Sequence, residues 1–186
     1  MRLIVGITGA SGAVYGVRLL ERLRDFPEVE IHLVVSRAGQ QVLQRETGRT
    51  PEDLRPLCQH CYNVEDLTAS LASGSFRTDG MVIAPCSVRT MSAVAAGLTS
   101  NLLLRAADVT LKEHRKLILL VRETPLHLGH LRTMTALAEM GAILAPPIPA
   151  FYHNPSSIMD LIDLSLDRVL DLLGLPPTDA KRWTET

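Results

Sequence analysis

Apolar and polar positions along the chain form blocks that predict buried strands, each followed by a helix. The strand-like blocks are short and rich in branched apolar residues, as in RLIVGIT at residues 2–8. The helix-like blocks carry apolar residues at helical spacing, as Val14, Val17, Leu20 and Leu23 do. We expect strands at residues 2–8, 29–36, 80–85, 115–121 and 142–147.

The same periodicity predicts helices at residues 12–26, 37–47, 88–98, 128–141 and 155–174. Residues 92–107, SAVAAGLTSNLLLRAA, are expected to form a helix of small residues that is buried against another subunit, because it is more apolar than an exposed helix should be. Ser157 and Asp160 have the spacing of a capping box at the start of the last helix. Residues 50–78 are polar and irregular, which indicates a loop-rich connection with room for one short helix.

Alternating strands and helices specify an α/β fold. We expect a doubly wound, mainly parallel sheet with helices on both faces, of the Rossmann or flavodoxin-like kind. A chain of 186 residues with 46% hydrophobic side chains can bury one substantial core but not two. A single domain over residues 1–186 is therefore predicted.

Charge and hydropathy exclude several classes of partner. The formal net charge is −1 and the 19 basic residues are spread along the chain, so nucleic acid and anionic membrane surfaces are not expected partners. No apolar stretch reaches membrane-spanning length, and the stretch before the first glycines is too short for a signal peptide. We expect a cytoplasmic protein without membrane insertion.

Cysteine and histidine spacing gives only weak indications of metal. Cys58 and Cys61, with His60 between them, resemble half a zinc site, but no second pair follows and structural zinc needs four ligands. A surface or half-buried pair is the favoured interpretation. His127 and His130 in HLGH are expected to be polar residues at a helix N-terminus, and no metal is predicted.

Polar or glycine-rich residues follow four of the predicted strands. In open parallel sheets ligands bind beyond the carboxyl ends of the strands, so these turns are the candidate site. Glycines at positions 6, 9 and 12 would let backbone amides approach a ligand, and Ser11 could cap the following helix. The spacing is not G-x-G-x-x-G, so a dinucleotide is not specifically indicated.

The turns after the second, third and fourth strands add hydroxyls and positive charge. Ser36, Ser87 and Thr90 could each be no more than helix caps. Three such turns at one edge, with Arg89 and Arg122 beside them, exceed what capping requires. They favour a ligand that carries a phosphate.

A second charged group comprises Arg105, Lys112, Arg122 and Glu123. Arg105 and Lys112 are seven residues apart, which on a continuous helix places them two turns apart on one side. A solvated helix face would explain that pair alone. It does not explain Arg122 and Glu123, which follow a buried strand.

These residues together resemble a known family, the flavin prenyltransferases of the UbiX/Pad type. That family belongs to the homo-oligomeric flavoproteins, which also include cysteine decarboxylases. The resemblance covers nearly the whole chain. It rests on GITGASGAVYGVRLLE, APCSVRT, LLLRAADVTLKE, VRETPLHLGHL, PPIPAFYHNPSS and a terminal RW at residues 182–183.

The resemblance implies an enzyme that transfers a dimethylallyl group from dimethylallyl monophosphate to N5 and C6 of reduced FMN without a metal. The product, prenylated FMN, would serve a UbiD-type decarboxylase, with ubiquinone biosynthesis as the expected pathway. The implied FMN contacts are Gly9, Ala10, Ser11, Ser36, Ser87, Val88, Arg89, Thr90 and Arg122. The implied prenyl-phosphate contacts are Tyr152, Arg168, Arg105 and Lys112.

The resemblance also implies catalytic roles. Arg105 and Lys112 would stabilise the charge that develops on the departing phosphate, and Glu123 would be a general acid toward it. Ser11 paired with Glu46 would remove the N5 proton. Leu67 stands where some relatives carry a tryptophan, so cation-π stabilisation of an allyl cation is not available there.

Two alternatives remain open at this point. One is oxidative decarboxylation of a cysteine, although such enzymes carry a Pro-Ala-Ser-Ala-Asn-Thr type of motif in place of APCSVRT. The other is a flavin-binding accessory subunit without catalysis, for which Glu123 and Arg168 would be superfluous. The resemblance implies a homododecamer built from trimers; the sequence itself indicates only that the protein is not a monomer.

Overall fold

The computed structural model describes residues 1–176, so the RW pair of the family resemblance lies outside the described residues. The chain divides into two compact units, the first ending at Pro146 and the second beginning at Pro147. The prediction of a single domain over residues 1–186 is not tested by this division and stays a prediction.

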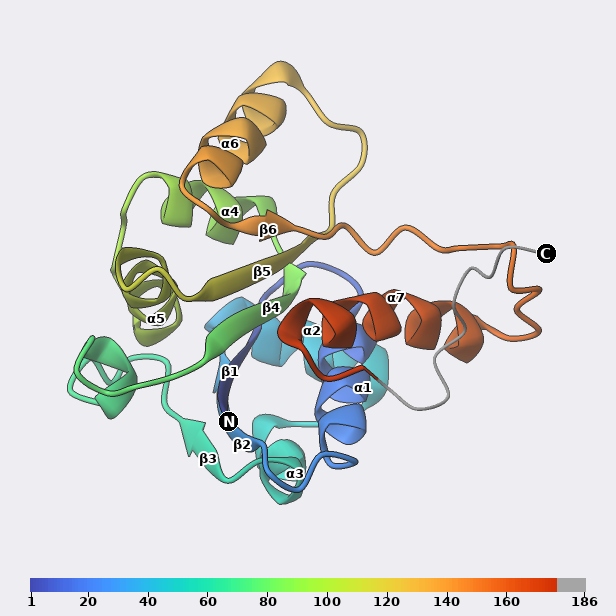
Figure 1. Cartoon of the computed structure of the whole chain (residues 1–186), viewed down its shortest axis with the longest axis horizontal. Coiled ribbons are helices and arrows are strands. Elements are labelled where there is room, and N and C mark those ends of the chain that lie inside the picture. The colour runs from blue at the N-terminus through green and yellow to red at the C-terminus, as the bar shows by residue number, and fades with distance from the viewer. Residues whose placement is uncertain (177–186) are drawn as a thin grey trace. The chain divides into compact units, whose positions relative to one another are not determined.

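The first unit is built on a six-stranded, wholly parallel sheet (Figure 1). Its strands are β1 (Arg2–Ile7), β2 (Glu30–Val35), β3 (His60–Tyr62), β4 (Gly80–Cys86), β5 (Lys116–Val121) and β6 (Ile143–Leu144). The strand order is β3-β2-β1-β4-β5-β6. This is the doubly wound order of the Rossmann fold, which confirms the predicted fold class.

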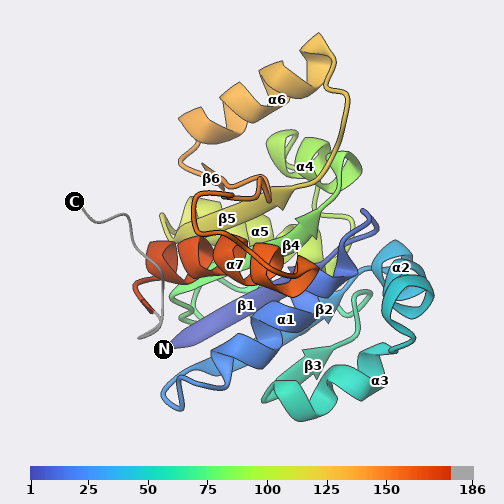
Figure 2. The ribbon, with the colours of Figure 1, turned by 90° about the vertical axis from the view of Figure 1, so that its right-hand side faces the viewer.

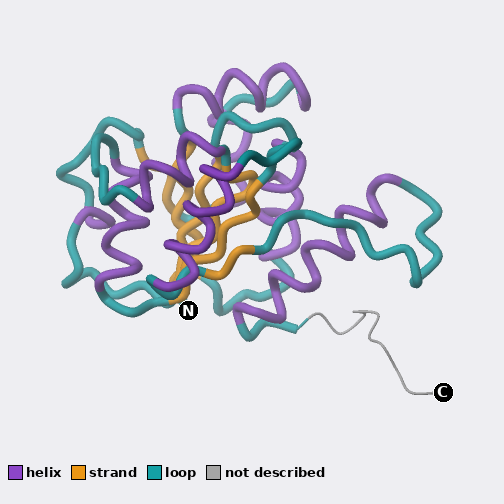
Figure 3. The backbone as a smooth tube through the Cα atoms, turned by 90° about the horizontal axis from the view of Figure 1, so that it is seen from above, coloured by secondary structure: helices purple, strands orange, loops and turns teal. Residues whose placement is uncertain are grey.

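Helices connect the strands on both faces of this sheet. They are α1 (Ala13–Leu23), α2 (Arg37–Thr47), α3 (Pro51–Leu54), α4 (Val88–Ala95), α5 (Leu102–Lys112) and α6 (Leu128–Glu139). Short 3-10 turns lie at Arg55–Leu57 and Ser70–Ala72. Figures 1 and 2 show α1 on one face of the sheet and α4 and α5 on the other. In Figure 3 the strands of this unit lie side by side between helices.

All five predicted strands are present, and one strand was missed. β3 lies in the segment that was expected to be a loop-rich connection, which also holds α3 and the 3-10 turns. Its three residues, His60 to Tyr62, are exposed or half-buried. Because β3 has no apolar run, its pairing with β2 is visible only in the folded chain.

The predicted helix over residues 92–107 was wrong as a single element. The chain leaves the helix after Ala95, and Gly97 has a φ of 67°, a left-handed conformation that ends helices. Asn101 then begins α5, where its side chain accepts a hydrogen bond from the backbone N–H of Leu104 at 3.0 Å. Two helices separated by a turn therefore replace the expected one.

The main core lies between the sheet and the helices α4 and α5. Its fully buried members include Met81 and Ile83 of β4, Leu119 of β5, and Leu103 and Ala107 of α5. The apolar runs of β4 and β5 are buried along almost their whole length, as expected for strands covered on both faces. This layer holds the carboxyl ends of the strands in fixed positions.

The second unit consists, within the described residues, of an extended segment and α7 (Ile158–Leu173). The predicted capping box is confirmed: Ser157 Oγ accepts from the N–H of Asp160, and the Asp160 carboxylate accepts from the N–H of Ser157. Among the described residues, no helix is both long and apolar enough to cross a membrane.

Candidate functional site

The carboxyl ends of β1, β2 and β4 meet around one cavity of about 730 Å³. β1 and β4 are neighbours in the sheet, but the chain leaves them in opposite directions, and such a switch point is where open parallel sheets bind ligands. We call this space the switch-point cavity. Its lining includes Gly9, Ser36, Arg37, Ala38, Val64, Glu65, Ser87, Arg89, Thr90, Ala93, Leu98, Leu103 and Leu104.

The turns after β1 and β4 are tied together by Thr8, which is buried. Its hydroxyl donates to the carbonyl of Pro85 at 2.6 Å and accepts from the N–H of Ser87 at 2.9 Å. The Ala84–Pro85 peptide bond is cis, and the register of β4 with β5 shifts between Ile83 and Cys86. These contacts fix where α4 begins.

The start of α4 offers a site for an anion. Ser87 is the N-cap, as predicted, and its Oγ accepts from the N–H of Thr90 at 3.3 Å. The N–H groups of Val88 and Arg89 are in the first turn, where no intrahelical carbonyl pairs with them. Arg89 is exposed, and no acidic side chain among residues 1–176 is paired with it. Backbone donors and an uncompensated positive charge therefore face the cavity together.

The turn after β2 forms another side of the cavity. Ser36 caps α2, as predicted, and its Oγ accepts from the N–H of Gly39 at 3.0 Å. Arg37 is ion-paired with Glu65 at 2.8 Å, so its charge is largely compensated. Gly9 is required here, because a Cβ at that position would lie 2.5 Å from the Cβ of Ala38.

The expectation that Ser11 caps α1 was wrong. The N-cap is Gly12, with a φ of 101° and no side-chain cap. A carboxylate from α2 takes that place: Glu46 Oε2 accepts from the N–H groups of Gly12 and Ala13, both at 2.9 Å. The helix terminus expected to favour an anionic ligand is thus already occupied by an anion of the chain itself.

Glu46 and Ser11, predicted as a pair, are brought together. Burial tends to raise the pKa of Glu46. That effect is outweighed by three hydrogen bonds, from the Ser11 side chain and the backbone amides of Ala13 and Gly12, and by the positive charge of Arg122. The pKa of Glu46 is therefore below its ordinary value of 4.5, and the carboxylate is ionised at neutral pH.

Arg122 and Glu123 follow β5 at the same edge of the sheet. The backbone N–H of Arg122 donates to the carbonyl of Cys86 at 3.0 Å, which places this turn beside the β4 turn. Glu123 is half-buried, and its Oε1 accepts from the N–H of Thr124 at 3.0 Å. The turns after β1, β4 and β5 are therefore neighbours.

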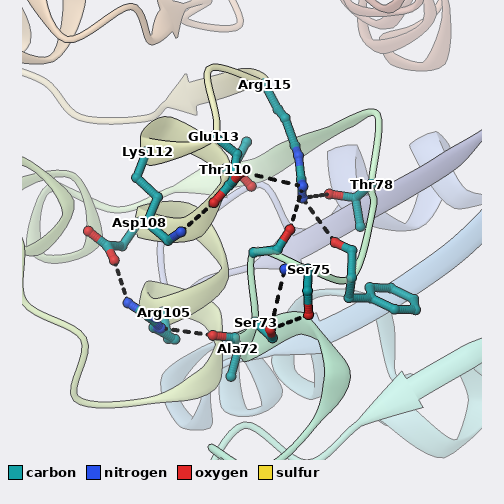
Figure 4. Close-up of polar contacts among 12 residues, drawn as sticks. Ala72, Ser73, Ser75, Thr78, Arg105, Asp108, Thr110, Lys112, Glu113 and Arg115 are labelled. Carbon is teal, nitrogen blue, oxygen red and sulfur yellow. Dashed lines mark hydrogen bonds and ion pairs between the residues drawn. The ribbon is translucent and has the colours of Figure 1, made fainter.

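Arg105 and Lys112 lie on α5, where Figure 4 shows their polar contacts, and neither is among the residues that line the switch-point cavity of their own chain. The Arg105 guanidinium donates to the carbonyl of Ala72 at 3.0 Å and pairs with Asp108 at 2.8 Å. Lys112 is ion-paired with Glu113. Both cations are thus engaged within the protomer, as on a solvated helix face.

Other predicted residues are also not among those that line the cavity: Ala10, Ser11, Glu46, Leu67, Val88, Arg122, Glu123, Tyr152 and Arg168. Tyr152 and Arg168 belong to the second unit, and both are exposed. Leu67 is 47% exposed and does not line the cavity. The roles of these side chains stay predictions.

Sequence reasoning missed part of the lining. Val64 and Glu65 come from the loop after β3, and Leu98, Leu103 and Leu104 surround the break between α4 and α5. Val64 and Glu65 were missed because strand β3, which precedes them, was not predicted. Leu98, Leu103 and Leu104 were missed because residues 92–107 were predicted as one helix without a turn.

Cys58 and Cys61 are half-buried free thiols, as the favoured interpretation had it. A hydrogen bond from Cys58 lowers the pKa of Cys61 to about 7 despite burial, and the same contact raises the pKa of Cys58. His127 is the N-cap of α6, and its ring accepts hydrogen bonds from the N–H groups of Gly129 and His130. This confirms its predicted position at a helix N-terminus.

A doubly wound sheet with an anion-binding turn at its switch point defines a class of nucleotide-binding proteins. The Flavoprotein family model matches residues 1–167, and the chain belongs to this family. Within it, the chain is 54% identical over 184 residues to the flavin prenyltransferase UbiX of Escherichia coli K12, with 98% of this chain and 97% of that one covered. The chain is a member of the flavin prenyltransferases.

Two solved structures support this assignment. The dodecameric FMN-dependent UbiX-like decarboxylase from Escherichia coli O157:H7 superposes with a TM-score of 0.97 at 46% identity, over all of both chains. AnUbiX in complex with FMN and dimethylallyl pyrophosphate superposes with a TM-score of 0.96 at 44% identity, over all of this chain and 98% of that one.

Proposed function

We propose that this protein transfers a dimethylallyl group from dimethylallyl monophosphate to reduced FMN, which makes prenylated FMN. The observation that carries the proposal is the switch-point cavity with its anion site at the start of α4, in a chain 54% identical to a flavin prenyltransferase. A cysteine decarboxylase or a non-catalytic flavin-binding subunit fits that identity less well.

The residues around the cavity fit FMN. The cavity volume of about 730 Å³ is within the range of cofactor pockets. The first-turn amides of α4 and Arg89 form a donor set suited to one phosphate, beside the Ser87 hydroxyl, which is hydrogen-bonded to Thr90 Oγ1. Val64, Leu103 and Leu104 provide an apolar wall for a ring system. Gly9, Ala10, Ser36, Thr90 and Arg122 complete the proposed FMN contacts.

Bound FMN supplies, in its reduced form, the N5 and C6 atoms that accept the prenyl group. We propose that Ser11 and Glu46 remove the proton that N5 must lose, which is supported by the hydrogen bond of the serine hydroxyl to an ionised carboxylate. Glu46 is held by two backbone amides, so its position is fixed before the substrate arrives. We propose that Ser11 passes the proton to Glu46.

The other half of the reaction breaks the allylic C–O bond and leaves negative charge on the phosphate. Hydrogen-bond donors lower the barrier if they bind the departing phosphate more tightly than they bind the phosphate of the intact ester. We propose Arg122, Tyr152 and Arg168 as such donors and Glu123 as the proton donor. Arg105 and Lys112 are not among the lining residues of their own chain's cavity, and we propose that they act in a site completed by a neighbouring copy. A Glu123→Gln variant with undiminished turnover would remove the acid role.

We further propose that the protein assembles as a homododecamer built from trimers; a relative of known structure is dodecameric. Its product would pass to a UbiD-type decarboxylase, with ubiquinone biosynthesis as the proposed pathway. A cytoplasmic location belongs to the same proposal, since the described cysteines are free thiols and that compartment keeps thiols reduced. The flavin-binding domain is proposed to span residues 1–186.

The test is an anaerobic turnover assay. The purified protein is incubated with reduced FMN and dimethylallyl monophosphate in the presence of a chelator, and the flavin is analysed by mass spectrometry. We expect a flavin heavier by one prenyl unit; a parallel reaction with the pyrophosphate establishes donor preference. FMN that stays bound but unmodified with both donors would refute the transferase and leave the decarboxylase or binding-subunit functions.

A further inference from the structure

Three side chains of metal-binding type gather at the opposite end of the strands from the switch-point cavity. Glu30 begins β2, His32 lies two residues later on the same face of that strand, and His60 begins β3. The parallel register places His32 beside His60. One potential ligand atom from each residue lies within 4.8 Å of the other two.

The Glu30 carboxylate lies between the two imidazoles. Its Oε1 is 3.2 Å from His32 Nε2 and 3.2 Å from His60 Nε2. In a tetrahedral zinc site with ligand distances of about 2.0–2.1 Å, neighbouring ligand atoms are about 3.3 Å apart. Both separations suit an ion between Glu30 and each histidine, and the ligand atoms of the two histidines lie within 4.8 Å of one another.

His32 provides an independent observation. Its side chain is only 1% exposed, and Nε2 has no hydrogen-bond partner among the described residues, because its approach to Glu30 lacks hydrogen-bond geometry. An unpaired buried nitrogen costs free energy, so native structures rarely keep one without a reason. A metal ion bound at Nε2 would supply the missing partner.

The neighbours of the cluster are arranged as outer-shell partners of a metal site. His32 Nδ1 lies 2.9 Å from the Tyr62 hydroxyl, which can accept its proton and thereby leave a lone pair on Nε2. Arg2 Nε donates to Glu30 Oε2 at 2.8 Å, which fixes the carboxylate, and Oε1 is hydrogen-bonded to the exposed His60 at 3.2 Å, a contact that a bound ion would replace. Partners of this kind orient metal-binding histidines and carboxylates.

We propose that Glu30, His32 and His60 bind one zinc ion, at a site that is separate from the flavin site and has no part in prenyl transfer. Two imidazoles and a carboxylate are ligands that zinc accepts, and the exposed side of His60 leaves a position for water and a path of entry. β3 is a three-residue strand at the sheet edge, so an ion that joins it to β2 would stabilise this edge.

The test measures zinc binding to the full chain, purified without a histidine tag. After equilibration with zinc and dialysis, we expect about one zinc per chain by mass spectrometry of the metals and a higher Tm than for the chelator-treated protein. With cobalt as the probe, we expect visible absorption without the near-ultraviolet band that thiolate ligands add.

Variants assign the ligands. His60→Gln keeps a donor toward Glu30 but removes a zinc ligand at an exposed position. We therefore expect a folded protein whose affinity for zinc is lower than that of the parent by a factor of about ten or more. His114→Gln, at another exposed histidine, should bind zinc as the parent does. A double variant, Cys58→Ser with Cys61→Ser, should also keep its zinc. Absence of zinc binding in the parent, unchanged affinity in His60→Gln, or loss of zinc only in the cysteine variant would each overturn the proposal.

Discussion

Glu46 is the residue whose position most constrains the chemistry of the site. Its carboxylate accepts two backbone hydrogen bonds at the start of α1 and one from the Ser11 side chain. It therefore stabilises a helix terminus and stands beside the hydroxyl proposed to handle the flavin proton. A single side chain thus has a structural contact and a proposed catalytic one.

Replacing Glu46 by Gln should lower kcat by about a hundredfold or more, because a proton acceptor is lost while the shape of the side chain is kept. FMN affinity should change little. Glu139→Gln, at the exposed end of α6, serves as the control. Steady-state turnover and FMN titration separate the two effects; a variant with normal kcat would show that Glu46 acts only as a cap.

The pH dependence of stability follows from the same pKa. Because the pKa of Glu46 is lowered on folding, its contribution to the free energy of unfolding is complete above its ordinary value of 4.5. That contribution is lost as the pH falls through the lower folded-state value. The difference in Tm between parent and Glu46→Gln should thus be constant near neutral pH and shrink below pH 4.5, as thermal unfolding across that range would show.

Arg89 and Arg37 both line the switch-point cavity but differ in their partners. Arg37 is paired with Glu65, whereas no acidic side chain among residues 1–176 is paired with Arg89. Arg89→Ala should raise the Kd for FMN about ten- to hundredfold, the usual effect of losing a hydrogen bond to a charged group. Arg37→Ala should raise it less than about threefold. Equal effects of the two variants in a fluorescence titration would contradict the placement of the phosphate at α4.

At the scale of the elements, the close approach of α1 to the sheet depends on one glycine. A Cβ at Gly16 would lie 2.4 Å from the carbonyl oxygen of Ala84, in the strand that leads to the Ser87 turn. The backbone of α1 therefore packs directly on β4. The geometry of the β4 turn depends on that contact.

Gly16→Ala should destabilise the protein by about 1–3 kcal/mol, because the methyl group must push α1 away from β4. The sign of the change in the free energy of unfolding is informative, because in an unhindered helix the same substitution would stabilise the protein by about 1 kcal/mol. Gln41→Ala, on the exposed face of α2, is the helical control. Denaturant unfolding that finds Gly16→Ala more stable than the parent would show that α1 can move without cost.

The sequence predicted the elements that have a strong local pattern. Strands β1, β2, β4 and β5 are long apolar runs, and the N-caps Ser36, Ser87 and Ser157 are residues that favour that position. The misses depend on contacts distant in sequence. β3 exists because it pairs with β2, and Gly12 is a cap because Glu46, 34 residues away, supplies the carboxylate.

At the scale of the whole molecule, the exposed side of α6 is unusually apolar. Leu126, Leu128, Leu131 and Met140 are each at least 40% exposed, and all lie on α6 or next to its ends. Exposed apolar groups of this extent mark contact surfaces. We infer that this surface, the α6 face, contacts another copy of the chain in the proposed dodecamer.

A double substitution on the α6 face, Leu128→Glu with Leu131→Glu, should therefore lower the molar mass in solution to that of a smaller assembly, because charge would be buried without a partner. Gln41→Glu on α2 is the matched control for added charge. Light scattering coupled to size exclusion gives the readout. A double variant with the mass of the parent would place the contact elsewhere.

The carboxylate at the start of α1 also bears on the kind of nucleotide that the sheet can bind. In dinucleotide-binding sheets of this topology, the turn after the first strand is where the pyrophosphate binds. Here that position carries the negative charge of Glu46. The pyrophosphate of a dinucleotide would therefore be repelled from it. Of the two turns at the switch point, the α4 turn is left for the phosphate of a nucleotide. We therefore expect the molecule to bind mononucleotides in preference to dinucleotides, because its own carboxylate occupies the pyrophosphate position.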